Sequence, residues 1–147
     1  MSSQQTDERP PRPLPQATPE TQAFWDGTTR GELIIQRCDA CAHAYFPPRP
    51  FCPECGGRSV SDEVASGRAT LYSYVINQRP HASFDGPVAV AVVELAEGPR
   101  MMTNIIDTPQ TEEALVLDME LDVVFEKQTD DISLPLFRPA TTNEVAS

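Results

Sequence analysis

Long apolar runs are absent from this 147-residue chain. No stretch approaches the roughly 20 consecutive apolar residues that a membrane-spanning helix needs, and the polar, proline-rich N-terminus lacks the apolar segment of a signal peptide. We therefore expect no membrane insertion and take the cytoplasm as the default location. Thiols stay reduced there, so the four cysteines favour a metal site over two disulfides.

The usual sequence signatures of catalysis are also missing. The chain has no G-x-S-x-G nucleophile motif, no phosphate-binding glycine loop and no H-E-x-x-H motif. If all four cysteines bind a metal, none remains as a nucleophile. We interpret His81 as an exposed loop histidine and expect a chain that is not catalytic by itself.

Basic residues are scarce. They number 11 against 22 acidic residues, which gives a net charge of -11 and argues against a nucleic-acid partner, because phosphate backbones are repelled. The charge is also uneven: residues 30–80 hold six arginines and five acids, whereas the residues after 80 hold thirteen acids and three bases. We expect any anionic ligand to meet the first half.

The cysteines form two close pairs, Cys38-x2-Cys41 and Cys52-x2-Cys55, with ten residues between the pairs. Each pair can fold into a tight turn that presents two thiolates to one tetrahedral ion, and four soft ligands suit zinc. Iron held by the same four thiolates is the chemical alternative. Four protein ligands leave no open coordination position, so we expect one structural zinc ion. Ala42 follows the first pair, where glycine would fit the turn more easily.

Local patterns divide the chain into five expected parts: a disordered tail (1–17), an N-terminal helix (18–30), a ribbon around the cysteines (31–63), a barrel (64–139) and a second disordered tail (140–147). The helix should start at Thr18-Pro19-Glu20, an N-cap followed by proline and an acid, and stop at Gly27. On it, Phe24 and Trp25 are too large to be hidden by the helix alone. They either pack on this chain or dock a partner or ligand.

Short runs of alternating or continuous apolar residues, separated by turn signals, predict the barrel strands at 70–76, 88–95, 101–106, 121–125 and 132–137. The only helical candidate among them is Gln110–Leu117. Four or five short strands with one helix-sized insert predict a mainly β fold with a five-stranded barrel of the OB type. A fragment of a β-sandwich is the alternative.

Several ordered motifs together resemble the DUF35 proteins over about residues 20–139. They are Phe24-Trp25, Arg37-Cys38-x2-Cys41, Tyr45-x-Pro47-Pro48-Arg49, Cys52-Pro53-x-Cys55-Gly56, Ser66 to Ser73, Val92 to Asn104 and Phe137-Arg138-Pro139. The resemblance implies a rubredoxin-like zinc ribbon followed by an OB-fold. Two departures are Ala42, where the family commonly has glycine after the first cysteine pair, and Leu117-Asp118-Met119, where the family often has glycine before the methionine.

The resemblance further implies a non-catalytic accessory subunit. Such proteins associate with acyl-CoA enzymes, chiefly thiolase-like condensing or retro-aldol enzymes and MaoC-type hydratases, including those that degrade steroid side chains or aromatic compounds. We expect the partner to supply the chemistry, while this chain shapes the hetero-oligomer and helps to place acyl-CoA. A stand-alone acyl-CoA-binding module and a nucleic-acid-binding OB protein are the alternatives.

The ribbon is the expected place for acyl-CoA or partner contacts, because it holds the arginines, and arginine suits the phosphates of coenzyme A. The candidate contact residues are Phe24, Trp25, Arg37, Tyr45, Pro48 and Arg49. For Arg37 and Arg49 the alternative is an ordinary surface charge or an ion pair with the chain's own acids.

Overall fold

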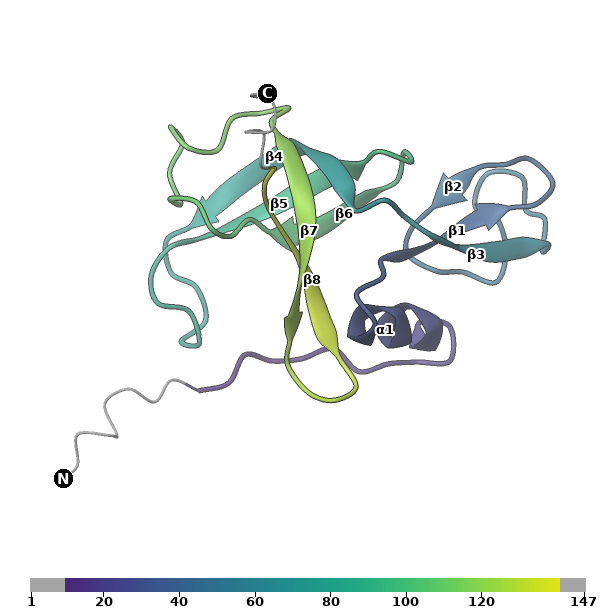
Figure 1. Ribbon diagram of the computed structural model, residues 1–147, viewed down its shortest axis with the longest axis horizontal. Coiled ribbons are helices and arrows are strands. Elements are labelled where there is room, and N and C mark those ends of the chain that lie inside the picture. The colour runs from purple at the N-terminus through teal and green to yellow at the C-terminus, as the bar shows by residue number, and fades with distance from the viewer. Residues whose placement is uncertain (1–9, 141–147) are drawn as a thin grey trace.

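The computed structural model describes residues 10–140. Its elements are α1 (Gln22–Thr29), then β1 (Ile34–Cys38), β2 (Ala44–Tyr45) and β3 (Val60–Val64) in the ribbon, and β4 (Arg68–Asn77), β5 (Val88–Leu95), β6 (Arg100–Asn104), β7 (Glu120–Lys127) and β8 (Ser133–Pro139) in the barrel. The ribbon and the barrel lie side by side, with α1 below their junction (Figure 1). The predicted mainly β fold with one short N-terminal helix is confirmed.

The barrel is a five-stranded sheet in the order β6-β5-β4-β7-β8. A parallel bridge between Ile105 and Phe137 joins its two edges, and the Thr103 hydroxyl donates to the Pro135 carbonyl across the same seam at 3.0 Å. The sheet is therefore nearly closed, which protects its edges. The predicted strand 88–95 coincides with β5, and the other four barrel predictions lie within two residues of the observed ends.

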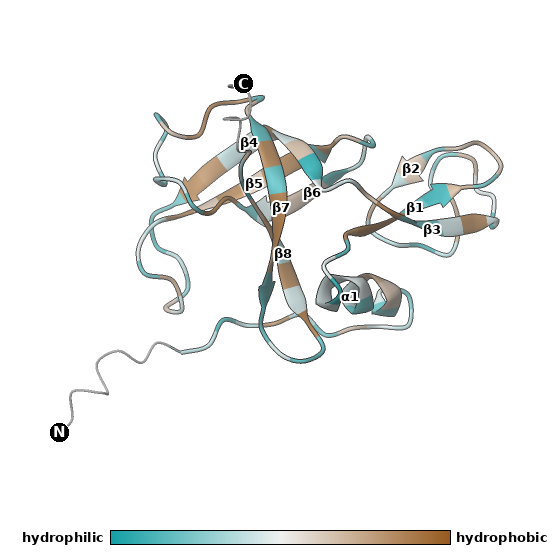
Figure 2. Cartoon of the chain, viewed as in Figure 1, coloured by the Kyte–Doolittle hydropathy of each residue, from teal (hydrophilic) through white to brown (hydrophobic). Residues whose placement is uncertain are grey.

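One hydrophobic core supports both parts of the molecule. Leu71, Val93 and Phe137 are fully buried in the barrel, and Leu33 and Ile35 at the start of the ribbon belong to the same buried cluster. Burying a side chain of this size contributes about 1.5–3 kcal/mol. Figure 2 shows the corresponding apolar stretches in brown along the barrel strands. Because β1 begins in this core, the cysteine at its end is held in a fixed position.

The helix prediction was wrong at both ends. The Thr18 and Thr21 hydroxyls bond each other at 3.0 Å, and this turn delays the helix until Gln22. At the other end the helix continues through Gly27, which is buried. A Cβ at Gly27 would lie 2.5 Å from Cγ1 of Ile34, so this glycine allows close packing against β1 and does not stop the helix.

The helical candidate Gln110–Leu117 was also wrong, because the segment forms only turns. The Gln110 side chain bonds the strand ends instead: its Oε1 accepts from the Ala89 amide at 2.6 Å, and its Nε2 donates to the Ile105 carbonyl at 3.0 Å. Thr111 then closes a single turn by accepting the Leu115 amide at 3.1 Å. No helix among residues 10–140 is long and apolar enough to cross a membrane.

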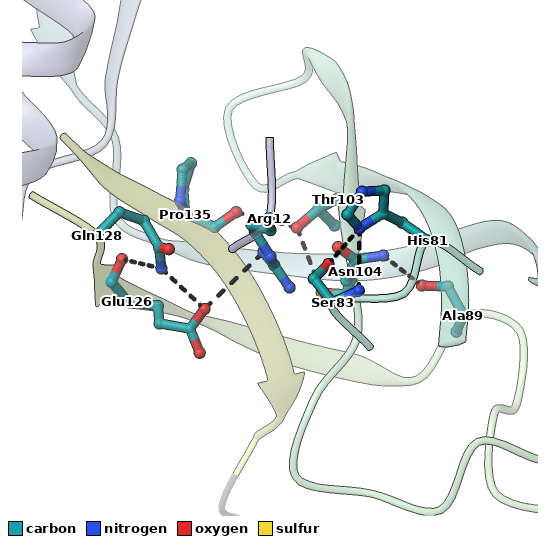
Figure 3. Close-up of polar contacts among 9 residues, drawn as sticks. All are labelled: Arg12, His81, Ser83, Ala89, Thr103, Asn104, Glu126, Gln128 and Pro135. Atoms are coloured by element: carbon teal, nitrogen blue, oxygen red, sulfur yellow. Dashed lines mark hydrogen bonds and ion pairs between the residues drawn. The ribbon is translucent and has the colours of Figure 1, made fainter. Parts of the chain in front are cut away.

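Most of the predicted disordered tails, 1–17 and 140–147, lies outside the described residues. Residues 10–17 have no regular secondary structure, yet Arg12 contacts the barrel. Its guanidinium lies 4.7 Å from the centre of the Phe84 ring and 3.9 Å from a carboxylate oxygen of Glu126. The close-up in Figure 3 shows Arg12 over the seam between β6 and β8.

Candidate metal centre

The two cysteine pairs form turns with the same hydrogen bonds. In the first, the Cys38 amide donates to the His43 carbonyl and the Ala42 amide donates to the Cys38 carbonyl, both at 2.9 Å. In the second turn, the Cys52 amide donates to the Gly57 carbonyl at 2.8 Å, and the Gly56 amide donates to the Cys52 carbonyl at 2.9 Å. Each turn therefore presents its two sulfur atoms to the space between the pairs.

The four sulfur atoms lie within 4.8 Å of one another. The sulfurs of Cys38 and Cys55, and those of Cys41 and Cys52, are 3.7 Å apart, far longer than a disulfide bond of about 2.05 Å. Cys38 and Cys52 are buried, whereas Cys41 and Cys55 are exposed. This cluster fits one tetrahedral ion with four thiolates, and the prediction that the four cysteines share one site is confirmed.

Backbone amides point at the sulfurs and favour their charged form. The amides of Cys41 and Glu54 lie 3.4 Å from the Cys38 sulfur and 3.3 Å from the Cys52 sulfur. The Cys41 amide is the main cause that lowers the pKa of Cys38 to about 7. For Cys41, the His43 amide lowers the pKa, but partial desolvation of the sulfur, although the residue is exposed, and hydrogen bonds to the other three thiols outweigh it and raise the pKa to about 12. Metal ligation requires cysteines in the thiolate form, so a bound cation would favour loss of the Cys41 proton.

Arg37 supports the first cysteine turn through hydrogen bonds. Its Nη1 donates to the Ala42 carbonyl at 2.7 Å, and its Nε and Nη2 donate to the two carboxylate oxygens of Glu63 at 2.6 and 3.2 Å. This two-pronged pair lowers the pKa of Glu63 and raises that of Arg37. These contacts favour the alternative that Arg37 pairs with the chain's own acid and supports the metal site.

The segment from Tyr45 to Arg49 is held in one shape. It contains a cis peptide bond between Phe46 and Pro47, the Tyr45 hydroxyl donates to the Arg49 carbonyl at 3.2 Å, and the Arg49 amide donates to Gln36 at 2.7 Å. Burial raises the pKa of Tyr45. Pro48 is half-buried.

The Arg49 side chain is exposed, and no carboxylate among the described residues forms a salt bridge with it. Both backbone polar groups of Arg49 are bonded, so its position is fixed while its charge stays available. Of the two predicted arginines, only Arg49 therefore offers an unpaired guanidinium.

A cleft of about 500 Å³ separates the ribbon from the β5–β6 turn. The ribbon contributes Arg37, His43 and Tyr45, and the turn contributes Glu97. One carboxylate oxygen of Glu97 accepts the Ser66 amide at 2.8 Å and so ties the ribbon–barrel linker to the turn. The other is buried without a partner among the described residues. Glu97 was not predicted from the sequence as a site residue. The sequence feature that could have pointed to Glu97 is its position within the Val92 to Asn104 motif.

Phe24 and Trp25 pack on this chain, although Trp25 also reaches a groove. Phe24 is 4% exposed, and its ring centre lies 4.8 Å from that of Trp25 and 5.2 Å from that of Phe46. The half-buried Trp25 lines an apolar groove of about 270 Å³ with Met101 and Leu134. Phe46 lines both this groove and the cleft beside the ribbon.

Comparison with known proteins agrees with this arrangement of ribbon and barrel. Residues 25–61 match the ChsH2 rubredoxin-like zinc ribbon domain, and residues 62–126 match the ChsH2 C-terminal OB-fold domain. A DUF35 domain-containing scaffold protein of Methanocaldococcus jannaschii is 31% identical over 102 residues, which are 67% of this chain and 71% of that protein.

The chain belongs to the DUF35 family.

Two further similar proteins are named as an enzyme or an enzyme subunit. A probable enoyl-CoA hydratase alpha subunit of Thermomonospora curvata is 36% identical over 97% of this chain, which spans 45% of that protein's length. In the solved structure of the Ltp2-ChsH2(DUF35) aldolase, one chain is 32% identical with a TM-score of 0.76, and the match covers 87% of this chain and all of that one. The zinc ribbon and the closed cysteine tetrad together identify the metal as structural zinc.

Proposed function

We propose that this DUF35 protein is a non-catalytic accessory subunit of a thiolase-like acyl-CoA enzyme, and that it shapes the complex and helps to place acyl-CoA. The observation that carries the proposal is the likeness to a chain of the Ltp2-ChsH2(DUF35) aldolase, all of which is matched by this chain. The reaction class proposed is a retro-aldol or thiolytic step in the degradation of steroid side-chain, aromatic or fatty acyl-CoA compounds.

The metal site supports an accessory role. Four thiolates complete the tetrahedral shell of zinc and leave no position for water or substrate. The zinc therefore stabilises the ribbon and neither polarises a carbonyl nor activates water. The enzyme partner would supply the nucleophile and the base.

A hydratase is the second candidate partner. The Thermomonospora curvata relative is named an enoyl-CoA hydratase alpha subunit, and it is more than twice as long as the region matched here. Under this alternative the same ribbon and barrel would serve a MaoC-type hydratase subunit. Identifying the partner separates the two.

An affinity pull-down of the tagged, full-length chain from its native host, with mass spectrometry of the eluate, tests the proposed function. We expect stoichiometric recovery of a thiolase-like subunit, and recovery of a hydratase subunit would select the second candidate. Recovery of the folded chain alone as a monomer would refute both and favour a stand-alone acyl-CoA-binding module.

Placement of acyl-CoA is proposed to involve Arg49. Its guanidinium is exposed, its backbone is bonded on both sides, and charge-assisted bonds to phosphate contribute about 1.5–3 kcal/mol each. We expect Arg49→Ala to raise the KM of the complex for acyl-CoA by about tenfold to a hundredfold, with kcat unchanged.

The matched control is Arg58→Ala, which removes the same charge from another exposed position of the ribbon. It should leave KM within about twofold, as expected for the loss of a remote surface charge. Unchanged KM in Arg49→Ala would remove Arg49 from acyl-CoA placement, and equal losses in both variants would indicate only general electrostatic attraction.

A further inference from the structure

Strand β5 is apolar on both of its faces. Its inward side chains include the small, buried Ala89 and Ala91, whereas Val90 and Val92 point outward and are half-buried. An antiparallel strand with one face in solvent normally alternates apolar and polar residues. Here the outward positions of Val90 and Val92 are apolar where this alternation predicts polar residues, so the outward face of β5 is suited to burial against something else.

The neighbouring strands extend this apolar surface. Val75 of β4 lies opposite Val90, and Met102 of β6 lies opposite Val92. Directly opposite residues of an antiparallel pair project from the same side of the sheet. Val75 is 64% exposed and Met102 is 69% exposed. We call this surface, made of Tyr72, Val75, Val90, Val92 and Met102, the outer face.

The exposed Ser73 lies opposite Val92 within the outer face, and further polar residues lie at its two ends. At one end the Arg100 guanidinium lies 3.8 Å from the centre of the Tyr72 ring and 3.5 Å from a carboxylate oxygen of Glu94. This ion pair leaves that end without net charge. An apolar centre with a polar rim is typical of a protein–protein contact.

At the other end a groove of about 430 Å³ runs between the loop after β4 and the strands β5 and β6, with Met102 and Val90 in its lining. The loop side carries His81, whose Nδ1 accepts the Ser83 amide at 3.0 Å. This bond leaves the proton on Nε2 as an available donor. Figure 3 shows the bonded His81–Ser83 pair beside Asn104 at the end of β6.

The net charge of the chain distinguishes between two possible occupants of this surface, a second copy of the chain and a different protein. A second copy would bring together two chains of net charge -11, with most of the acids in the barrel, and their repulsion opposes self-association. A different protein with an apolar centre and a basic rim would match both the outer face and the acidic barrel around it.

We propose that the outer face is the docking surface for the partner subunit, and that the partner contributes an apolar patch rimmed by lysine and arginine. This inference rests on the proposed function and adds to it the place and chemistry of the contact. Ribbon contacts with acyl-CoA and barrel contacts with the partner would then occupy different parts of the chain.

The test uses Val75→Lys and Met102→Lys in the full-length, zinc-loaded chain, co-expressed with the subunit that the wild-type chain recovers. Both positions are more than 60% exposed, so the fold should tolerate lysine, and circular dichroism and zinc content verify it. We expect each variant to lower the yield of the complex at least tenfold. The matched control is Val64→Lys on β3, which makes the same change at 55% exposure and should keep the wild-type yield.

The outcomes separate the two proposals. Full recovery of the partner by Val75→Lys and Met102→Lys would overturn the docking surface and leave the proposed function intact. An equal loss with Val64→Lys would also overturn it. Failure of the wild-type chain to recover any identified acyl-CoA enzyme would overturn both. Sedimentation of the isolated chain should show a monomer, and a dimer that Met102→Lys dissociates would show that the occupant is a second copy.

Discussion

The two cysteine turns differ at one backbone position, and exchanging the residues there gives a sharp prediction. Ala42 has φ of 67° and Gly56 has φ of 78°, so both lie in the left-handed region. For a residue with a Cβ, this backbone conformation is less favourable in free energy by about 1–2 kcal/mol than it is for glycine. Glycine loses about 0.4–1 kcal/mol of this advantage because it is freer in the unfolded chain.

We therefore expect Ala42→Gly to stabilise the zinc-loaded protein by about 0.5–1 kcal/mol, and Gly56→Ala to destabilise it by a similar amount. The added methyl group at Gly56 meets no atom within 4 Å, so its effect is backbone strain alone. Since folding of the turns is coupled to metal binding, these changes correspond to roughly threefold shifts in zinc affinity in opposite directions.

Urea unfolding of the zinc-saturated proteins measures the change in stability, and competition with a chromophoric chelator measures the change in zinc affinity. Asp118→Gly is the control, because Asp118 also has positive φ, 72°, but lies far along the chain from the cysteines. Aspartate visits this region more readily than alanine, so its replacement should change stability by less than about 0.5 kcal/mol and leave zinc affinity unchanged. Weaker zinc binding by Ala42→Gly would refute the reasoning.

Two further predictions concern the metal and its support. Cys52→Ser should abolish stoichiometric zinc, measured by plasma mass spectrometry, while the circular dichroism of the barrel persists; stoichiometric iron in the protein from its native host would contradict the zinc assignment. Glu63→Gln should lower the free energy of unfolding by about 0.5–1 kcal/mol at pH 7. Because Arg37 lowers the pKa of Glu63, this difference should hold above the ordinary glutamate pKa of about 4.3 and shrink as the pH falls below it; a constant difference down to pH 3 would contradict it.

The strands could be predicted because their signal is local. The run from Val88 to Leu95 is bounded by turn residues on both sides and coincides with β5. The cysteine site was equally local, since two pairs within 18 residues leave few other arrangements. The family resemblance also placed glycine at the positions of Ala42 and Asp118, and both proved to have positive φ.

The features that were missed depend on residues far apart in the sequence. In the sequence Gly27 resembles a helix stop, whereas in the structure it allows Ile34 to pack closely against the helix. The Gln110 side chain reaches Ala89 across 21 residues, and Glu97 reaches Ser66 across 31. Such contacts are fixed by the closure of the barrel, and no helical or strand period encodes them.

The two ribbon arginines show why a shared residue type does not give a shared role. Arg37 uses its guanidinium to bind Glu63 and the carbonyl of Ala42, one residue after a metal ligand. Removing it would disturb the zinc turn as well as any ligand, so lower acyl-CoA affinity in an Arg37 variant would have two causes. Arg49 has its backbone bonded, and no carboxylate in residues 10–140 forms a salt bridge with it, so a change in acyl-CoA affinity at that position can be assigned to the ligand itself.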